Sequence, residues 1–304
     1  NFARKGVERM DPVEVKALTV AVDATAGFLA PESFQQELIK LLTVYSPIRQ
    51  YAKVIQVGAS EIKYPRRLTS PTGTWTGEIV TRTGSEPSYE QLTLTPHELA
   101  TFTDVSNALL EDNVYNLQSE LASEFAESFG ISEGAAFVSG DGTGKPKGLL
   151  ATGVITNEVK TGVAADFPAS NPADKVIDLF HKLPGVHAQN AVWLMNRNTL
   201  GVVRKWKDST GNYLLISPIT AGAPNTILGR PVVEAVDMPD IGAGTNPIVF
   251  GDMQGYRIID RVNLAILRDP YTLALNGQVR FHARKRVGGD VTHPDRFARL
   301  KCSV

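Results

Sequence analysis

The sequence predicts an α+β fold with two domains and one long two-stranded projection. Three observations predict it: apolar residues recur at helical spacing after position 113, residues 52 to 96 lack a large apolar face, and strand and helix patterns alternate from 150 to 263. Apolar residues make up 42 % and charged residues 21 % of the 304 positions, which is typical of globular proteins. A disordered or fibrous chain is therefore excluded.

Residues 1–29 are predicted to form an extended arm. They hold four basic and four acidic residues, and they end in the small-residue stretch Ala24-Thr25-Ala26-Gly27. Pro31 is then expected to open a short amphipathic helix, because Phe34, Leu38, Leu41 and Leu42 fall on one helical face. Ser46-Pro47 is expected to end this helix.

Residues 52–96 are predicted to form a two-stranded excursion. Strand patterns at Val54–Val57 and Ile62–Tyr64 lead into a stretch rich in Gly, Ser, Thr and Pro, whose tip is expected to carry Arg66, Arg67 and Trp75. A structureless loop of this length is uncommon unless it is functional. Because an isolated hairpin is only marginally stable, we expect it to need a partner surface outside its own domain.

A strand at Leu99–Val105 is expected to precede a long helix over about 113–138, capped by Asp112 or Asn113. Between Ser106 and Ser139 there are six acidic residues and no Lys or Arg, whereas 280–301 holds seven basic residues against two acidic ones. These two segments either lie near each other or form separate solvated faces; the sequence leaves both open. The helix pattern is carried by Val114, Leu117, Leu121, Phe125 and Phe129.

The remaining chain predicts a mixed α/β domain followed by a final strand pair. Strand patterns are expected at 191–195, 231–236, 247–250 and 256–259, and helical patterns at 173–183 and 199–206. The last pair is predicted at Leu264–Arg268 and Gln278–Val287.

Charge and composition exclude several classes of protein. The 31 basic and 32 acidic residues leave a net charge of −1, which argues against a protein that grips nucleic acid over its whole surface. No apolar run approaches the length of a membrane helix, and the N-terminus lacks the apolar region of a signal peptide. The single cysteine, Cys302, cannot form an intrachain disulfide and suits a reducing cytosol.

No motif predicts catalysis, a cofactor or a metal. Gly140–Pro146 differs from a phosphate-binding P-loop in spacing and follows a helix, so it is predicted to be a helix stop and a tight turn. Gly130-Ile131-Ser132-Glu133-Gly134 matches a hydrolase nucleophile elbow, but Ser132 falls inside the predicted long helix. The five histidines show no metal-binding spacing. A serine hydrolase remains only a remote alternative.

Five stretches follow one another along the chain: AGFLAP with SPIR; EGAAF with GDGTGKPKGLL; WLMN with KDSTGNYLL; LGRPVVEAVDMP and FGDMQGYRIIDR to RDPYT; and RKRVGGDVTHPDRFARLK. In this order they resemble the major capsid proteins of tailed double-stranded-DNA bacteriophages with the Hong Kong 97-type fold, and the resemblance covers about residues 24–304.

The resemblance implies an N-terminal arm at 1–29 and an extended loop at 52–96 that reaches over a neighbouring subunit. It also implies an axial domain at 150–263 around the symmetry axis of a hexamer or pentamer. The long acidic helix corresponds to the family's spine helix. A discontinuous peripheral domain is expected at 30–51, 97–149 and 264–304.

The resemblance further implies a non-enzymatic shell protein without a cofactor, which assembles in the host bacterial cytoplasm and encloses packaged DNA in a virion. Expected partners are other copies of the chain, a portal protein, a scaffold segment or protease, and a decoration protein. The missing initiator Met fits either a trimmed chain or a mature chain made by cleavage upstream, and the second agrees with the family's cleavage of an N-terminal scaffolding segment. Alternatives are the shell of a gene transfer agent or an encapsulin-type nanocompartment. The residues expected at assembly contacts are Arg66, Arg67, Trp75, Glu78, Arg284 and Arg286.

Overall fold

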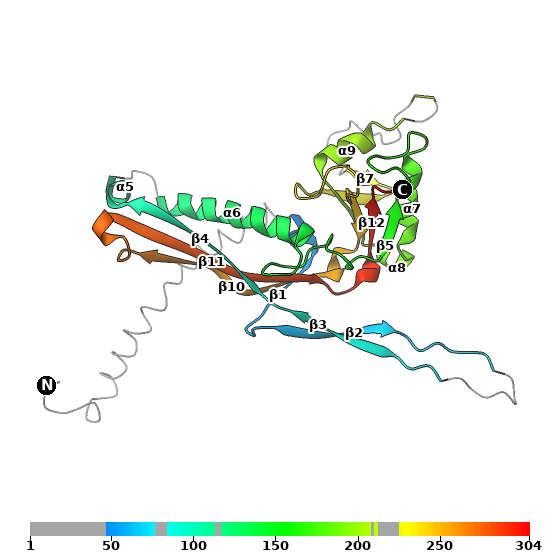
Figure 1. Ribbon diagram of the computed structural model, residues 1–304, viewed down its shortest axis with the longest axis horizontal. Helices are drawn as coiled ribbons and strands as arrows, with labels where there is room; N and C mark the ends of the chain where they lie inside the picture. The colour runs from blue at the N-terminus through cyan, green and yellow to red at the C-terminus, as the bar shows by residue number, and fades with distance from the viewer. Residues whose placement is uncertain (1–46, 77–83, 113–116, 208–209, 212–224) are drawn as a thin grey trace.

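A computed structural model describes the protein over residues 47–76, 84–112, 117–207, 210–211 and 225–304. The molecule is elongated: a long sheet with one helix along it extends from a second lobe that holds the C-terminus, and a hairpin projects from the junction (Figure 1). The predicted arm, the helix expected after Pro31, and Glu78 lie outside the described residues.

The long sheet has four strands in the order β1-β10-β11-β4. β10 and β11 form a 14-residue antiparallel ribbon, β4 pairs antiparallel with the outer side of β11, and β1 runs parallel to β10. The strand expected at Leu99–Val105 and the final strand pair are thereby confirmed. The strands are β1 (Lys53–Gln56), β4 (His97–Ser106), β10 (Tyr256–Asp269) and β11 (Gln278–Val291).

The predicted long helix is α6 (Leu117–Ser139), which lies along one face of this sheet (Figure 1). Its 23 residues make a helix of roughly 35 Å. Phe125 and Phe129 are buried in one cluster with Phe281 of β11, so the i, i+4 pattern does mark the face that packs on the sheet. A separate short helix, α5 (Asn107–Asp112), precedes α6, and the alternative cap Asn113 lies outside the described residues.

The helix stop expected at Gly140 is confirmed. A Cβ at Gly140 would lie 2.1 Å from the Pro146 carbonyl oxygen, so only glycine lets the chain fold back so closely. Gly142 and Gly144 both have positive φ, and Asp141 Oδ1 accepts a hydrogen bond from the Thr143 amide at 3.0 Å. The segment is therefore a tight turn.

The second lobe contains a six-stranded mixed sheet in the order β5-β12-β9-β6-β8-β7. Trp193 of β6 packs against Phe250 of β9, with the ring centroids 4.2 Å apart. Its indole N–H donates a hydrogen bond to the Ile227 carbonyl at 2.9 Å. The strands are β5 (Asn157–Lys160), β6 (Val192–Met195), β7 (Thr226–Ile227), β8 (Arg230–Glu234), β9 (Ile248–Gly251) and β12 (Phe297–Lys301); the helices are α7 (Ala173–Lys182), α8 (Gly185–Ala188) and α9 (Arg197–Arg204).

The sheets do not follow the expected domain boundary near residue 263. β10 begins at Tyr256 and is one continuous strand of the long sheet, whereas β12 returns from the C-terminal segment to lie between β5 and β9. One buried cluster contains Phe137 from α6, Leu194 from β6 and Tyr256 from β10, so the two lobes share a core.

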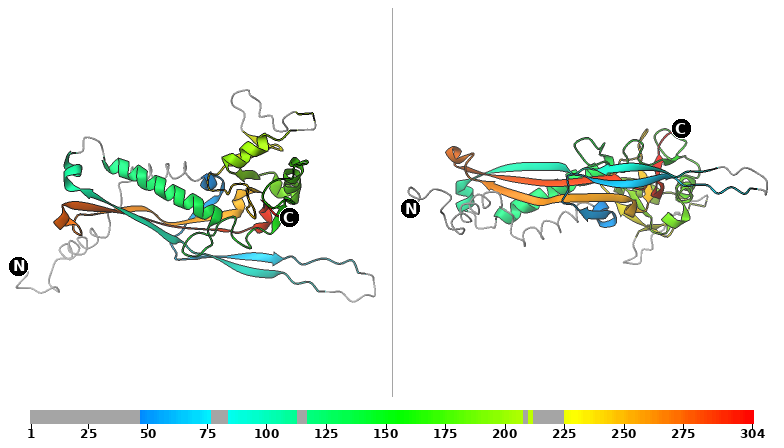
Figure 2. Two further views of the ribbon diagram at one scale, coloured as in Figure 1. Left: turned by 45° about the horizontal axis from the view of Figure 1, so that its top comes forward. Right: turned by 90° about the horizontal axis from the view of Figure 1, so that it is seen from below.

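The hairpin is made of β2 (Ile62–Thr69) and β3 (Ser88–Leu94), which pair only with each other among the described strands. It projects from the body of the molecule in Figure 1 and in the left view of Figure 2. Its start differs from the expected residue 52, because β1 belongs to the long sheet. The helix end expected at Ser46-Pro47 lies at the border of the described residues, which open with α4 (Pro47–Tyr51).

Candidate assembly surfaces

The projecting hairpin exposes apolar side chains far from any core. Arg66 and Arg67 lie within β2 and not at the tip as expected; Arg66 bonds Glu90 across the hairpin at 2.6 Å, and Arg67 is paired in register with Tyr89. Tyr89 is 66 % exposed and Trp75, beyond the end of β2, is fully exposed. Exposed aromatic residues grouped on one projection are typical of an interaction surface.

The open face of the long sheet, turned away from α6, carries a row of basic side chains on β11. Arg280 makes a bidentate pair with Asp104 at 2.6 and 2.9 Å, and this bonding holds the pKa of Asp104 below its ordinary value. Arg286 reaches Glu98 at 3.1 Å. Arg284 lies between Ala100 and Ala265 in register and makes no ion pair with any residue that the structure describes.

The far end of the long sheet presents a second apolar group. The turn between β10 and β11 leaves Tyr271 86 % and Leu275 fully exposed. Asp269 fixes this turn by accepting hydrogen bonds from the Tyr271 and Thr272 amides at 2.9 and 3.1 Å. Because these hydrogen bonds fix the turn, the two apolar side chains are exposed together, which is typical of an interaction surface. The sequence analysis missed it, although the stretch from Pro270 to Gln278 holds no charged residue.

A buried charge network at the junction was also missed. Arg49 of α4 donates to Asp260 at 2.6 Å and to Glu133 at 3.0 Å, and Lys285 of β11 donates to the other oxygen of Glu133. Glu133 is 1 % and Lys285 3 % exposed. Burial opposes the charge on Arg49, but its bonds to the two carboxylates raise its pKa above the ordinary value. The network ties α4, α6 and the long sheet together.

The network refines the charge inference drawn from the sequence. The acidic helix does lie on the basic strand, but Glu133 is the acid that meets it, whereas Glu120, Glu124 and Glu127 face solvent. Arginines of the basic segment pair instead with acids outside the helix, as Arg299 does with Glu158 at 2.7 Å. Both alternatives therefore hold, each for part of the helix.

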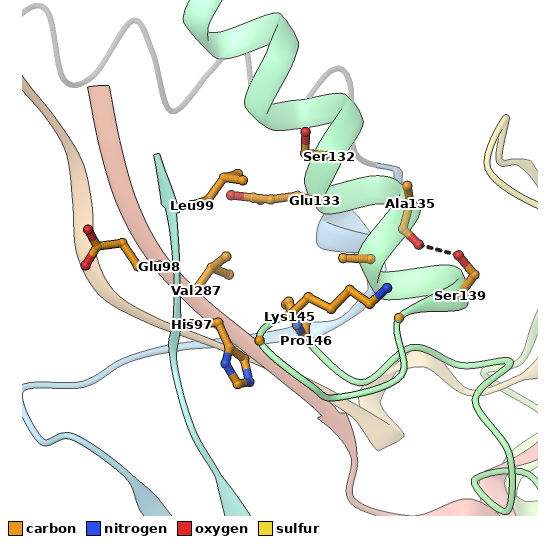
Figure 3. Close-up of a pocket in the computed structure, with 13 residues that line it drawn as sticks. His97, Glu98, Leu99, Ser132, Glu133, Ala135, Ser139, Lys145, Pro146 and Val287 are labelled. Carbon is orange, nitrogen blue, oxygen red and sulfur yellow. Dashed lines mark hydrogen bonds between the residues drawn. The ribbon is translucent and has the colours of Figure 1, made fainter. Parts of the chain in front are cut away.

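A pocket of about 290 Å³ lies between α6, the start of β4 and the turn after α6 (Figure 3). Ala135 and Ala136 of the helix, Leu99 of β4 and Pro146 of the turn give it apolar walls, and Lys145 lies at its side. Ser132 also lines it and lies inside α6, as expected, and not on the strand-to-helix turn that a nucleophile elbow requires.

Among the described residues, no group of three or more His, Cys, Asp or Glu side chains could hold a metal ion. No helix in that part of the chain is long and apolar enough to cross a membrane.

Comparison with known proteins decides the family. The model of the phage capsid family matches residues 26–302, nearly the whole chain. The chain belongs to the phage capsid family. A curated relative, the major capsid protein of Klebsiella oxytoca phage phiKO2, is 22 % identical over 267 residues, which are 84 % of this chain and 61 % of the relative. The chain thus spans about three fifths of that relative's length.

Solved capsid structures resemble this phage capsid family member over most of its length. The capsid of a native gene transfer agent (GTA) particle is 37 % identical, with a TM-score of 0.78 over 86 % of this chain and 91 % of that chain. Solved structures from Microbacterium phage Oxtober96 (16 % identity, TM-score 0.66, 84 % of this chain and 90 % of that chain covered) and Gordonia phage Cozz (15 %, 0.62, 85 % and 87 %) share the fold. The predicted Hong Kong 97-type fold is confirmed.

Proposed function

We propose that the chain is the major capsid protein of a tailed phage, which self-assembles as hexamers and pentamers into an icosahedral shell around packaged double-stranded DNA. The observation that carries this proposal is the family match over residues 26–302. The projecting hairpin supports it, because a two-stranded excursion without its own core needs a partner surface. A non-enzymatic role follows from the same proposal.

Three surfaces are available for contacts between copies: the hairpin, the open face of β11 and the far turn of the long sheet. Arg284 supports the second of these, because an exposed guanidinium between two alanines leaves room for a carboxylate of a neighbour. We assign Arg66, Arg67, Trp75, Glu78, Arg284 and Arg286 to such contacts. Several ordinary interfaces closed by symmetry add up to a durable shell.

The near balance of 31 basic and 32 acidic residues supports a container that confines DNA without binding a particular sequence. Assembly in the bacterial cytoplasm, a location in the virion, and partners such as a portal protein, a scaffold segment or protease, and a decoration protein follow from the same proposal. The predicted domain division remains part of it, except that β10, from Tyr256 onward, belongs to the long sheet and so ends the axial domain before the expected residue 263.

The particle mass of the purified protein tests the proposal, measured by light scattering together with negative-stain microscopy. Closed shells of megadalton size or free capsomers are expected. A stable 33 kDa monomer at every concentration would overturn the proposal, and a hydrolase substrate panel would then follow.

Deletion of residues 66–86 should leave a folded chain, by circular dichroism, that closes no shells. The control is Ser123→Ala, on the exposed side of α6 and outside the pocket lining, which should leave assembly unchanged. Normal shells from the deletion would show that the hairpin is not an assembly element.

A gene transfer agent shell is the second candidate, favoured by the 37 % identity to a GTA capsid. Sequencing the nuclease-protected DNA inside the particles separates the two candidates. A single viral genome supports the phage shell, and fragments of cellular DNA support the gene transfer agent. Particles that hold a protein cargo and no DNA would indicate an encapsulin-type compartment.

A further inference from the structure

The pocket beside α6 adjoins an unpaired strand edge. β4 is the last strand of the long sheet, and its backbone pairs with β11 alone among the described elements. The edge carries no proline, no lysine and no bulge, and its two acids are neutralised by Arg280 and Arg286. Proteins usually protect such an edge, so an open one beside an apolar pocket indicates an occupant.

The pocket has the size and the chemistry to receive an indole ring. A cavity of about 150 Å³ already accepts benzene, and this pocket has about 290 Å³. Its walls include the alanine methyl groups of α6 and the ring of Pro146, while Ser132 supplies a hydroxyl that can accept the indole N–H. Lys145, 52 % exposed, can place its ammonium over the ring face.

Trp75 is the side chain whose indole ring could occupy such a pocket. It is fully exposed, and it lies on the projecting hairpin beyond the end of β2. An aromatic side chain buries roughly 150–250 Å² when it is enclosed, which makes it a strong anchor at an interface. Extended residues with small side chains precede it, from Thr72 to Thr74, so their backbone can approach a strand edge.

We propose that Trp75 of one copy inserts into this pocket of the neighbouring copy, with the flanking backbone along the free edge of β4. The proposal rests on the proposed function, because it names the partner surface of the hairpin. The pocket begins at His97, three residues after the hairpin ends at Leu94, so every copy carries the site at its hairpin's base and the anchor near its tip.

This arrangement makes a head-to-tail contact. From Ile62 to Trp75 the hairpin reaches about 43 Å at ~3.3 Å per residue, so each copy would contact the next at a fixed displacement. A contact of that kind closes into a ring when the rotation between copies divides a full turn. Trp75 therefore serves contacts within a capsomer, which leaves the far turn with Tyr271 for other contacts.

Tryptophan fluorescence before and after assembly tests the proposal. The chain has three tryptophans, of which Trp193 is fully and Trp206 partly buried, so a change on assembly reports mainly on Trp75. We expect a blue shift and protection from iodide quenching, both absent in Trp75→Phe. Ala136→Leu, which fills the pocket, should raise the concentration for half-assembly at least about tenfold. The matched control is Ser123→Leu, an exposed position of the same helix more than two turns before Ser132, which should change neither quantity.

A disulfide test leaves the tryptophan and the apolar walls intact. Thr76→Cys combined with Ser132→Cys should link neighbouring copies through disulfides, so that oxidation gives covalent species up to pentamers or hexamers. Cys302 is buried and does not compete. Thr76→Cys with Ser123→Cys, a position on the side of α6 opposite Ser132, should give none. Assembled capsomers whose Trp75 stays quenchable and whose cysteines do not link would overturn this inference and leave the proposed function standing. A chain that never assembles contradicts both.

Discussion

Glu133→Gln should destabilise the folded chain strongly, because the carboxylate is the centre of the buried network. Glu133 accepts from Lys285 and, at 3.0 Å, from Arg49, and its side chain is 1 % exposed. Glutamine keeps the shape and removes the charge, which leaves the Lys285 ammonium buried without a counter-ion. Removing one partner of a buried ion pair costs about 3–5 kcal/mol, so we expect a loss of that size in the free energy of unfolding.

Two further variants separate the network from ordinary ion pairs. Adding Lys285→Met to Glu133→Gln removes the orphaned ammonium and should recover at least about half of the loss, since Arg49 keeps Asp260. The matched control is Arg286→Met on the same strand. Its pair with Glu98 has side chains 40 % and 44 % exposed, so the change should cost about 0–1 kcal/mol.

The free energies of unfolding are measured in urea for five chains: wild type, Glu133→Gln, Lys285→Met, the double variant and Arg286→Met. Unfolding is followed by far-ultraviolet circular dichroism at one protein concentration. A loss for Glu133→Gln no larger than that for Arg286→Met would refute the reasoning. So would a double variant whose loss is the sum of its two single losses, because the charges would then act independently.

Gly140→Ala should cost about 1–3 kcal/mol, because its Cβ meets the backbone oxygen of Pro146 at 2.1 Å; Gly134→Ala, in thermal melts of both, should stay within about 1 kcal/mol of wild type, since its Cβ meets a movable carboxylate. Burial raises the pKa of Asp237, so its charge is disfavoured in the fold; Asp237→Asn should be more stable than wild type at pH 7, and the difference should vanish below about pH 3.8 in a urea series. Ser132→Ala should change no esterase activity; a measurable activity lost on that change would revive the hydrolase alternative.

Periodicity predicts the main elements because one buried face per element is a local property. Every fourth position of α6 from Leu121 to Phe137 is buried, and Glu133 occupies one of these positions. Alternate positions of β11 from Val279 to Val287 are buried, and Lys285 occupies one of those. An acid on one buried stripe and a base on the other must neutralise each other. The positions of single charged residues in the two stripes therefore indicate this contact, whereas the total charges of the two segments do not.

Sheet membership could not be predicted, because it depends on pairings between distant segments. β12 is five residues long and two of them are basic, and nothing local indicates that it lies between β5 and β9. β10 crosses the expected domain boundary since its first residues, from Tyr256, are needed by β1 and β11. The hairpin shows the same limit: its composition predicts a projection, but not that Arg66 is held by Glu90 within β2.

The residues that carry the family resemblance stabilise the junction of the two lobes. Arg49 and Glu133 come from two separate recognisable stretches and bond each other there, and the glycine-rich turn closes the end of the same helix. Trp75 lies in none of these stretches. The fold depends on this junction, whereas the proposed contact between copies depends on exposed side chains. That contact therefore has to be derived from the surface of this chain. The glycine-rich turn that ends the spine helix α6 also lines the pocket proposed for the neighbour's tryptophan. The same residues therefore stabilise the junction of the lobes and shape a contact between copies.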